Sequence, residues 1–122
     1  MTIPRLPDAE LVIMNTIWRE NTEMTSAEVI HLMANQKDWS VTTISTFLSR
    51  LTERGFLTVR KNGRTNIYKA AIQEDDYIES ESKSFLKHLH GNSLTSFVAA
   101  LYKGKAISKD DLDELKAFID GR

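Results

Sequence analysis

Apolar residues recur at spacings of three and four in the first third of the chain, a pattern typical of amphipathic helices. We expect a first helix from Asp8, as its N-cap, to about Glu20. Thr25 and Glu28 have the spacing of a capping box, which predicts a second helix to about Asn35. The residues expected to be buried are Leu11, Met14, Ile17 and Trp18 in the first helix, and Ile30 and Met33 in the second.

A third helix is expected between Ser40, a good N-cap, and Gly55, which suits the position just beyond a helix C-terminus. Its apolar arc comprises Val41, Ile44, Phe47, Leu48 and Leu51. The rest of the helix is rich in hydroxyls, although Ser and Thr compete with a helix for backbone hydrogen bonds. Such short groups suit close approach to phosphates and base edges, although a merely tolerated solvated face remains the alternative. This face comprises Thr42, Thr43, Ser45, Thr46, Ser49 and Arg50.

Two strand-like runs then flank Asn62-Gly63, which is a strong signal for a β-hairpin. A two-residue turn at Asn62-Gly63 would place Lys61 directly opposite Arg64, which is repulsive. We therefore expect a three-residue loop, which pairs Val59 with Ile67. In either register the hairpin tip carries three cations that packing does not require. They are Arg60, Lys61 and Arg64.

Beyond Ala71 the apolar spacing predicts three further short helices, two ending near Gly91 and Gly104 and the third starting at Ser108. Three short helices contain too little material for a core of their own. We therefore expect their apolar stripes to pack against a second copy of the chain. The residues expected in this dimer interface are Ile78, Phe85, Leu89, Leu94, Phe97, Leu101, Leu112, Leu115 and Phe118.

Charge is distributed unevenly along the 122 residues, although the net charge is only −1. Residues 1–38 carry three basic and six acidic side chains, and residues 70–122 carry seven basic and ten acidic ones. Residues 39–69 carry six basic side chains against Glu53 alone. Such a block predicts an electropositive patch that faces a polyanion, because an ordinary solvated surface mixes both signs.

Several classes of protein are excluded by what the sequence lacks. The absence of cysteine excludes disulfides, thiolate metal sites and cysteine nucleophiles. The sequence shows neither a membrane-length apolar run nor a secretory signal, so a cytoplasmic protein without membrane insertion is expected. It contains no Ser-His-Asp arrangement, phosphate loop or zinc-protease motif, so we expect neither an enzyme nor a cofactor. His88 and His90, two residues apart on a helix, point in different directions and predict no metal site.

The order of three helices and a hairpin is that of a winged helix-turn-helix. We expect a mainly α fold with a small β-hairpin, divided into a DNA-binding domain over residues 1–71 and a three-helix dimerisation domain over residues 72–122. The third helix would enter the major groove of double-stranded DNA, and the hairpin wing would touch the backbone. The same fold also serves as a protein-interaction module, which would show no salt-sensitive binding to a duplex and is the alternative.

Several segments also resemble a known family. The sequence WSVTTISTFLSRL at residues 39–51, followed by ERGFL at residues 53–57, resembles the recognition helix of the penicillinase repressor family. Residues 8–18 resemble its first helix, Ile67-Tyr68 fall where its second wing strand lies, and segments between residues 92 and 115 resemble its dimerisation helices. The resemblance covers nearly the whole chain. It implies a dimeric bacterial repressor of transcription that binds palindromic operators, commonly upstream of β-lactamase or related resistance genes.

The resemblance also implies roles for particular residues. Residues facing DNA would be Thr42, Thr43, Ser45, Thr46 and Arg50. Family members often have basic side chains where this chain has Thr42 and Ser45. The resemblance therefore does not predict the operator sequence, and it implies that the wing contributes part of the affinity. In β-lactam-responsive members proteolysis within the dimerisation region ends repression. The matching bond here is Ser96–Phe97, with Ser in place of the common Asn.

Two implied partners differ between branches of that family. A membrane sensor-protease, or a protease acting downstream of it, is the partner expected for a β-lactam-responsive member. The copper-responsive branch instead binds metal through C-terminal Cys-x-Cys pairs. This chain contains no cysteine, which argues against metal sensing through thiolates.

Overall fold

The computed structural model describes residues 3–121 and divides the chain into two compact units. Unit 1 extends to Glu81 and unit 2 begins at Ser82. The boundary therefore falls within a helix, ten residues beyond the expected division after Ala71. The reason is a buried tyrosine at the start of that helix, which belongs to the core of unit 1.

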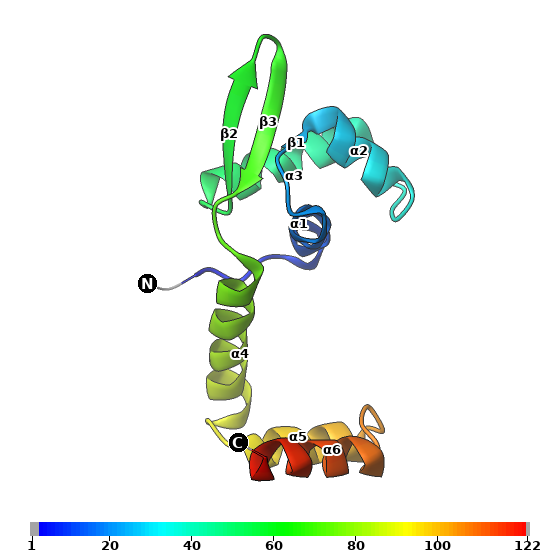
Figure 1. Ribbon diagram of the computed structural model, residues 1–122, viewed down its shortest axis with the longest axis vertical. Coiled ribbons are helices and arrows are strands. Elements are labelled where there is room, and N and C mark those ends of the chain that lie inside the picture. Colours follow the sequence, from blue (N-terminus) through cyan, green and yellow to red (C-terminus); the bar gives the residue numbers. More distant parts are fainter. Residues whose placement is uncertain (1–2, 122) are drawn as a thin grey trace. The chain divides into compact units, whose positions relative to one another are not determined.

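Unit 1 is a winged helix-turn-helix, as the sequence predicts (Figure 1). Its three strands form one antiparallel sheet in the order β1-β3-β2, and the hairpin of β2 and β3 extends away from the helices. The core lies between the helices and the base of the sheet. The elements are α1 (Asp8–Glu20), β1 (Met24–Thr25), α2 (Ser26–Ala34), α3 (Val41–Glu53), β2 (Leu57–Asn62) and β3 (Thr65–Ala70).

Helix ends follow the local signals with one exception. The capping box of Thr25 and Glu28 is present at the start of α2, and the Ser40 hydroxyl accepts a hydrogen bond from the Thr43 amide at the start of α3. The prediction that Asp8 caps α1 is wrong, because Pro7 occupies the N-cap and contributes no side-chain hydrogen bond. Asp8 is instead the first helical residue, where an acidic side chain is favourable next to the positive end of the helix dipole.

The C-terminus of α3 closes in a Schellman motif, which explains the glycine there. The Phe56 amide donates to the Leu51 carbonyl at 2.9 Å, and the Gly55 amide donates to the Thr52 carbonyl at 3.1 Å. Gly55 has a φ of +83°, a left-handed conformation that glycine adopts without strain. The motif turns the chain directly from α3 into β2 and places the wing beside this helix.

The expected register of the hairpin is wrong. Asn62 pairs with Thr65 and Val59 pairs with Tyr68, so the loop contains two residues, Gly63 and Arg64. Gly63 has a φ of +67°, as the first central position of a type II′ turn requires. Lys61 and Arg64 do not repel each other across the hairpin, because Arg64 lies in the turn and Lys61 pairs with Asn66. This register also puts Tyr68 on the buried side of the sheet, whereas a shift by one residue would turn it outward.

Burial also differs from expectation at several positions in the helices. Leu11 and Trp18 of α1 are half-buried, whereas Met14 and Ile17 are fully buried. Val29 and Met33 are the fully buried residues of α2, whereas Ile30 is only half-buried. In α3, Val41 was expected in the apolar arc but is exposed, because it lies at the first residue of the helix beyond the reach of the core. Ile44, Leu48 and Leu51 are fully buried as predicted.

The buried tyrosine that extends unit 1 is Tyr77. Its ring lies 5.7 Å from the ring of Trp18 and 5.6 Å from that of Phe56, and its hydroxyl accepts a hydrogen bond from the Leu6 amide. The Trp18 indole N–H donates to the carbonyl of Ile72 at 2.9 Å. These contacts fix the segment after the wing to the core of unit 1, so a fragment ending at Ala71 would lack part of that core.

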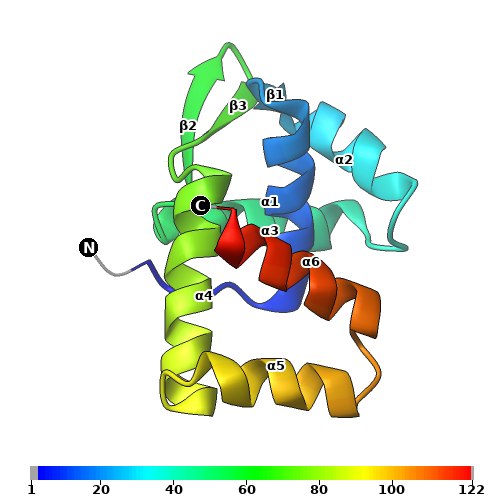
Figure 2. The same ribbon diagram turned by 60° about the horizontal axis from the view of Figure 1, so that its bottom comes forward.

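Unit 2 contains the end of α4 (Glu74–His90) followed by α5 (Leu94–Lys103) and α6 (Lys109–Asp120) (Figure 2). Helix bounds agree with the predicted stripes, and Ser108 and Asp111 form a capping box at the start of α6. None of residues 82–121 is fully buried. Unit 2 therefore has no closed core within one copy of the chain.

Candidate nucleic-acid interface

The hydroxyl-rich face of α3 is exposed. Thr42, Ser45, Thr46, Ser49 and Arg50 all lie in solvent, opposite the three fully buried leucine and isoleucine side chains. The Thr46 hydroxyl donates to the Thr42 carbonyl at 3.0 Å, so it presents its lone pairs and methyl group outward. A surface of short donors, acceptors and methyl groups can approach base edges closely.

Thr43 differs from the other residues expected on this face. It is half-buried, and its hydroxyl accepts a hydrogen bond from the Ser40 hydroxyl at 2.9 Å. Thr43 is therefore part of the N-terminal cap of α3. The ring of Trp39 lies edge-on to that of Phe47 at 5.3 Å, which packs the segment before the helix against it.

Two cations of the basic block are paired within unit 1. Arg54, just after α3, forms an ion pair with Glu10 of α1, whose side chain is only 2% exposed. Arg60 of β2 pairs with Glu23 at 2.7 Å. The hydrogen bond and positive charge of Arg60 lower the pKa of Glu23, with a smaller contribution from Lys69. Both acids lie outside the basic block, so the sequence pattern alone did not reveal these pairs.

Within residues 3–121, four cations of the basic block form no ion pair. They are Arg50 on α3, Lys61 on β2, Arg64 in the hairpin turn and Lys69 on β3. The register places Lys61 on the sheet face that meets α3, and Arg60 and Lys69 on the opposite face near Glu23. The interface expected from sequence is thus divided: Arg50, Lys61 and Arg64 are available to an anion, while Arg60 already has a carboxylate.

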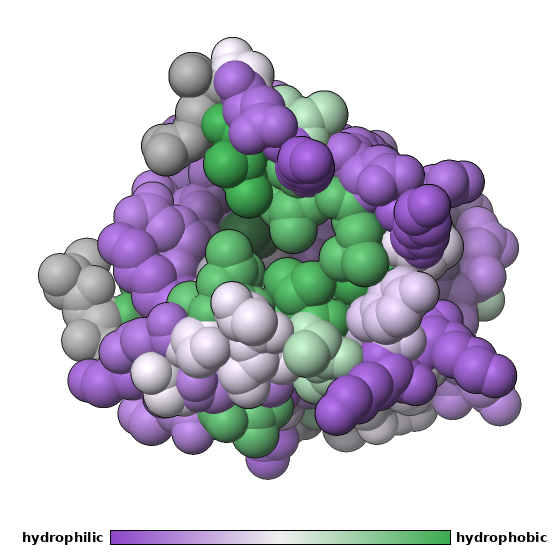
Figure 3. Space-filling model, turned by 90° about the horizontal axis from the view of Figure 1, so that it is seen from below, coloured by the Kyte–Doolittle hydropathy of each residue, from purple (hydrophilic) through white to green (hydrophobic). Residues whose placement is uncertain are grey.

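The residues expected in a dimer interface are largely accessible. Leu89 is 65% exposed and Phe118 is 71% exposed, and Ile78, Phe85 and Leu94 are exposed as well. Phe97, Leu101, Leu112 and Leu115 are half-buried. Figure 3 shows green apolar side chains around a hollow that is ringed by hydrophilic residues. Contiguous exposed apolar surface of this kind marks an interaction site.

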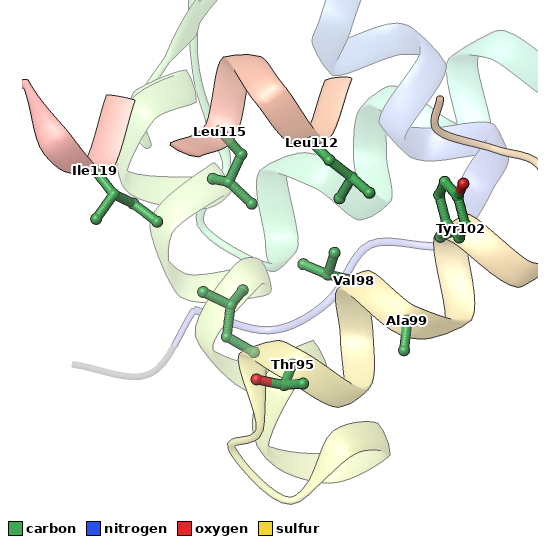
Figure 4. Close-up of a pocket in the computed structure, with 8 residues that line it drawn as sticks. Thr95, Val98, Ala99, Tyr102, Leu112, Leu115 and Ile119 are labelled. Atoms are coloured by element: carbon green, nitrogen blue, oxygen red, sulfur yellow. The ribbon is translucent and has the colours of Figure 1, made fainter. Parts of the chain in front are cut away.

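An apolar groove of about 400 Å³ runs between α5 and α6. In Figure 4, Leu112, Leu115 and Ile119 of α6 point toward the side of α5 that carries Val98 and Tyr102. Leu94, Thr95 and Ala99 complete the lining. The groove remains open in a single chain, so its walls stay in contact with water.

The Ser96–Phe97 bond lies in the first turn of α5. The Ser96 amide donates to the Ser93 hydroxyl at 3.0 Å, and the Ser96 hydroxyl is 2.9 Å from Nδ1 of His90. Phe97 packs edge-on against Phe85 at 5.4 Å. His88 contacts Ser84 instead, and the described residues contain no group of three side chains able to hold a metal ion.

Comparison with known proteins identifies the family. The profile of the family described as Penicillinase repressor matches residues 6–121. The chain belongs to the penicillinase repressor family. The Penicillinase repressor of Bacillus licheniformis is 36% identical over 118 residues, covering 97% of this chain and 91% of that protein. The Methicillin resistance regulatory protein MecI of Staphylococcus aureus (strain N315) is 28% identical over 115 residues, covering 94% and 93%.

Solved structures of the family match somewhat less than two thirds of the chain. The DNA-binding domain of the repressor BlaI matches with a TM-score of 0.56 and 40% identity over 63% of this chain and 94% of that one. Monomeric BlaI of Bacillus licheniformis in complex with the blaP half-operator matches with a TM-score of 0.53 and 39% identity over 62% and 92%. The family consists of repressors rather than enzymes, in agreement with the sequence prediction. Within residues 3–121, no helix has both the length and the apolar character to cross a membrane.

Proposed function

We propose that this member of the family represses transcription by binding an operator in double-stranded DNA, with α3 in the major groove and the wing along the backbone. The observation that carries the proposal is the exposed hydroxyl face of α3 beside the unpaired cations Arg50, Lys61 and Arg64. Hydroxyls can read base edges while cations neutralise phosphates. The complex of BlaI with its half-operator, at 39% identity, supports the same use of unit 1.

We propose further that the repressor is a homodimer joined through unit 2. Support comes from the open groove between α5 and α6 and from exposed apolar residues such as Leu89 and Phe118. Burying one such side chain contributes about 1.5–3 kcal/mol, so a second copy would gain much by covering them. A two-fold dimer presents two copies of α3, so its operator would be a palindrome of two half-sites.

The names of the relatives suggest what is repressed. They are called penicillinase repressors and methicillin resistance regulatory proteins, so a β-lactamase or related resistance gene is the proposed target. A protein with this role acts on bacterial DNA and is therefore proposed to lie in the cytoplasm. Derepression is proposed to follow cleavage of Ser96–Phe97 by a sensor-dependent protease, since this cut separates α6 and most of α5 from unit 1.

Duplex selection tests the proposal directly. The full chain is mixed with a random-sequence duplex pool, the bound fraction is enriched, and the affinity for the selected duplex is measured between low and high salt. We expect an inverted repeat. Six phosphate contacts, three from each protomer, give a slope of log K against log salt of about −5. Failure to enrich any duplex would refute the proposal and favour a protein-interaction module.

A further inference from the structure

A second feature of unit 1 lies between the recognition helix and the wing. A groove of about 300 Å³ is lined by Ser49 and Thr52 of α3 and by Val59, Lys61, Asn66 and Tyr68 of the hairpin. We call it the α3–wing notch. The register produces it, because Lys61 pairs with Asn66 and Val59 pairs with Tyr68 on the same sheet face. Had the loop contained three residues, these side chains would not share that face.

The lining of the α3–wing notch is chemically one-sided. It contains no acidic residue, and it brings together the Lys61 ammonium, the Asn66 amide and the Ser49 hydroxyl. Within the part of the chain that the structure describes, none of these three groups forms an intramolecular side-chain hydrogen bond or ion pair. The Thr52 hydroxyl, by contrast, donates to the Leu48 carbonyl at 2.9 Å. One positive charge and two neutral donors without partners match an anion with several acceptor oxygens.

The position of the α3–wing notch selects a DNA phosphate as that anion. Thr42, Thr46 and Ser49 follow one another at helical spacing and form one stripe along α3. Ser49 lies seven residues beyond Thr42, or about 10 Å along the helix axis. The major groove is about 12 Å wide. If the N-terminal end of α3, at Thr42, meets base edges, Ser49 therefore reaches the DNA backbone that borders the groove.

We propose that the α3–wing notch binds one backbone phosphate of the operator in each half-site, with Lys61, Asn66 and Ser49 as its ligands. This inference rests on the proposed function and adds a defined anchor to it. A phosphate held between helix and wing fixes the depth and angle of α3 in the major groove, whereas the Thr42–Thr46 stripe reads the bases. Asn66 thereby gains a role that the charge pattern does not assign to it, and Ser49 of the hydroxyl face is assigned to a phosphate rather than to a base edge.

The test combines variants of the notch with neutralised phosphates in the duplex. A methylphosphonate replaces one phosphate at a time in the duplex selected by the full chain, and affinities are measured for the wild type, Lys61→Gln and Ser49→Ala. Lys69→Gln is the matched control, because it removes the same charge from the opposite face of the same sheet. Unchanged thermal unfolding of each variant confirms that the wing is intact.

In the wild type, we expect neutralisation of one particular phosphate per half-site to weaken binding about tenfold, as for the loss of a hydrogen bond to a charged group. The methylphosphonate at that phosphate should cause little further loss of affinity in Lys61→Gln and a reduced loss in Ser49→Ala. Lys69→Gln should show the full loss of affinity. If the losses from Lys61→Gln and from every methylphosphonate simply multiply, the notch does not hold a phosphate and the inference is wrong. If the wild type selects no duplex, the proposed function itself fails.

Discussion

The ion pair between Glu10 and Arg54 gives the sharpest prediction about stability. Arg54 follows α3 and Glu10 lies on α1, so the pair joins α3 to the first helix of unit 1. We expect Arg54→Met to destabilise the fold, because it leaves the Glu10 carboxylate buried without a counter-charge. Arg50→Met is the matched control, since it removes the same charge one turn earlier from an exposed position.

The magnitude follows from the burial of the two side chains. Removing one partner of a fully buried pair costs about 3–5 kcal/mol. The Glu10 side chain is 2% exposed, but that of Arg54 is 40% exposed, so water can solvate the carboxylate in part once the arginine is gone. We therefore expect a loss of about 2 kcal/mol for Arg54→Met and a change within about 0.5 kcal/mol for Arg50→Met. With a urea dependence of about 2 kcal/mol per molar, the midpoint falls by about 1 M.

Tryptophan fluorescence during urea denaturation measures this effect in the full chain. Both tryptophans, Trp18 and Trp39, lie in unit 1, so the signal reports the unit that contains the ion pair. Protein concentration is held constant because association of unit 2 would add to the apparent stability. Glu10→Gln combined with Arg54→Met should be more stable than Arg54→Met alone, since no unpaired charge remains. Equal midpoints for Arg54→Met and Arg50→Met would refute the reasoning.

Three further predictions concern DNA reading, association and pH. Arg64→Ala should weaken binding to all duplexes alike, whereas Thr46→Ala should change the preference among point-mutated operators; equal sequence profiles in a binding panel would contradict this division. Leu115→Asp should place a charge in the groove between α5 and α6 and convert the proposed dimer to a monomer in sedimentation, while Asp113→Asn on the exposed side of α6 should not. A Leu115→Asp variant that remains dimeric would place the interface elsewhere. Hydrogen bonds from the Thr25 backbone, and to a lesser extent from the Thr25 side chain, lower the pKa of Glu28. The Glu28 carboxylate therefore stabilises the fold above its ordinary pKa of 4.5, and this stabilisation is lost as the pH falls through the lowered pKa of the folded state. The difference in urea midpoint between the wild type and Glu28→Gln should therefore shrink between pH 6 and pH 3, and a constant difference would show that ionisation of Glu28 does not contribute.

Local signals in the sequence were sufficient for most of the fold. The capping box of Thr25 and Glu28, the cap at Ser40 and the glycine after α3 depend on neighbours within a few residues, and each is confirmed by the structure. Helical spacing located each of the six helices within residues 3–121 for the same reason. The two-residue strand β1 was missed, because two residues are too few to show alternation.

Features that depend on residues far apart in the sequence could not be predicted from these local signals. The hairpin register depends on which residues the sheet buries against α3, and this overrides the local charge argument that favoured a longer loop. The α3–wing notch depends on that register and was missed with it. The end of unit 1 depends on Tyr77, which gives no signal in the sequence because an exposed and a buried tyrosine in a first helical turn have the same pattern.

The six cations of the basic block have different roles in the folded protein. Its charge predicts an anion partner, but two of its arginines are bound by acids 44 and 37 positions away along the chain. Arg54 holds α3 on α1, and Arg60 links β2 to Glu23, which precedes β1, so both stabilise the element that presents the others. Among the described cations on α3 and on the face of the wing that meets α3, only Arg50, Lys61 and Arg64 then remain available to bind phosphates. Loss of repression in a charge-removing variant therefore has two possible origins, and only the stability of unit 1 distinguishes them. Arg54→Met should lower affinity in proportion to unfolding, whereas Lys61→Gln should lower it in a fully folded protein.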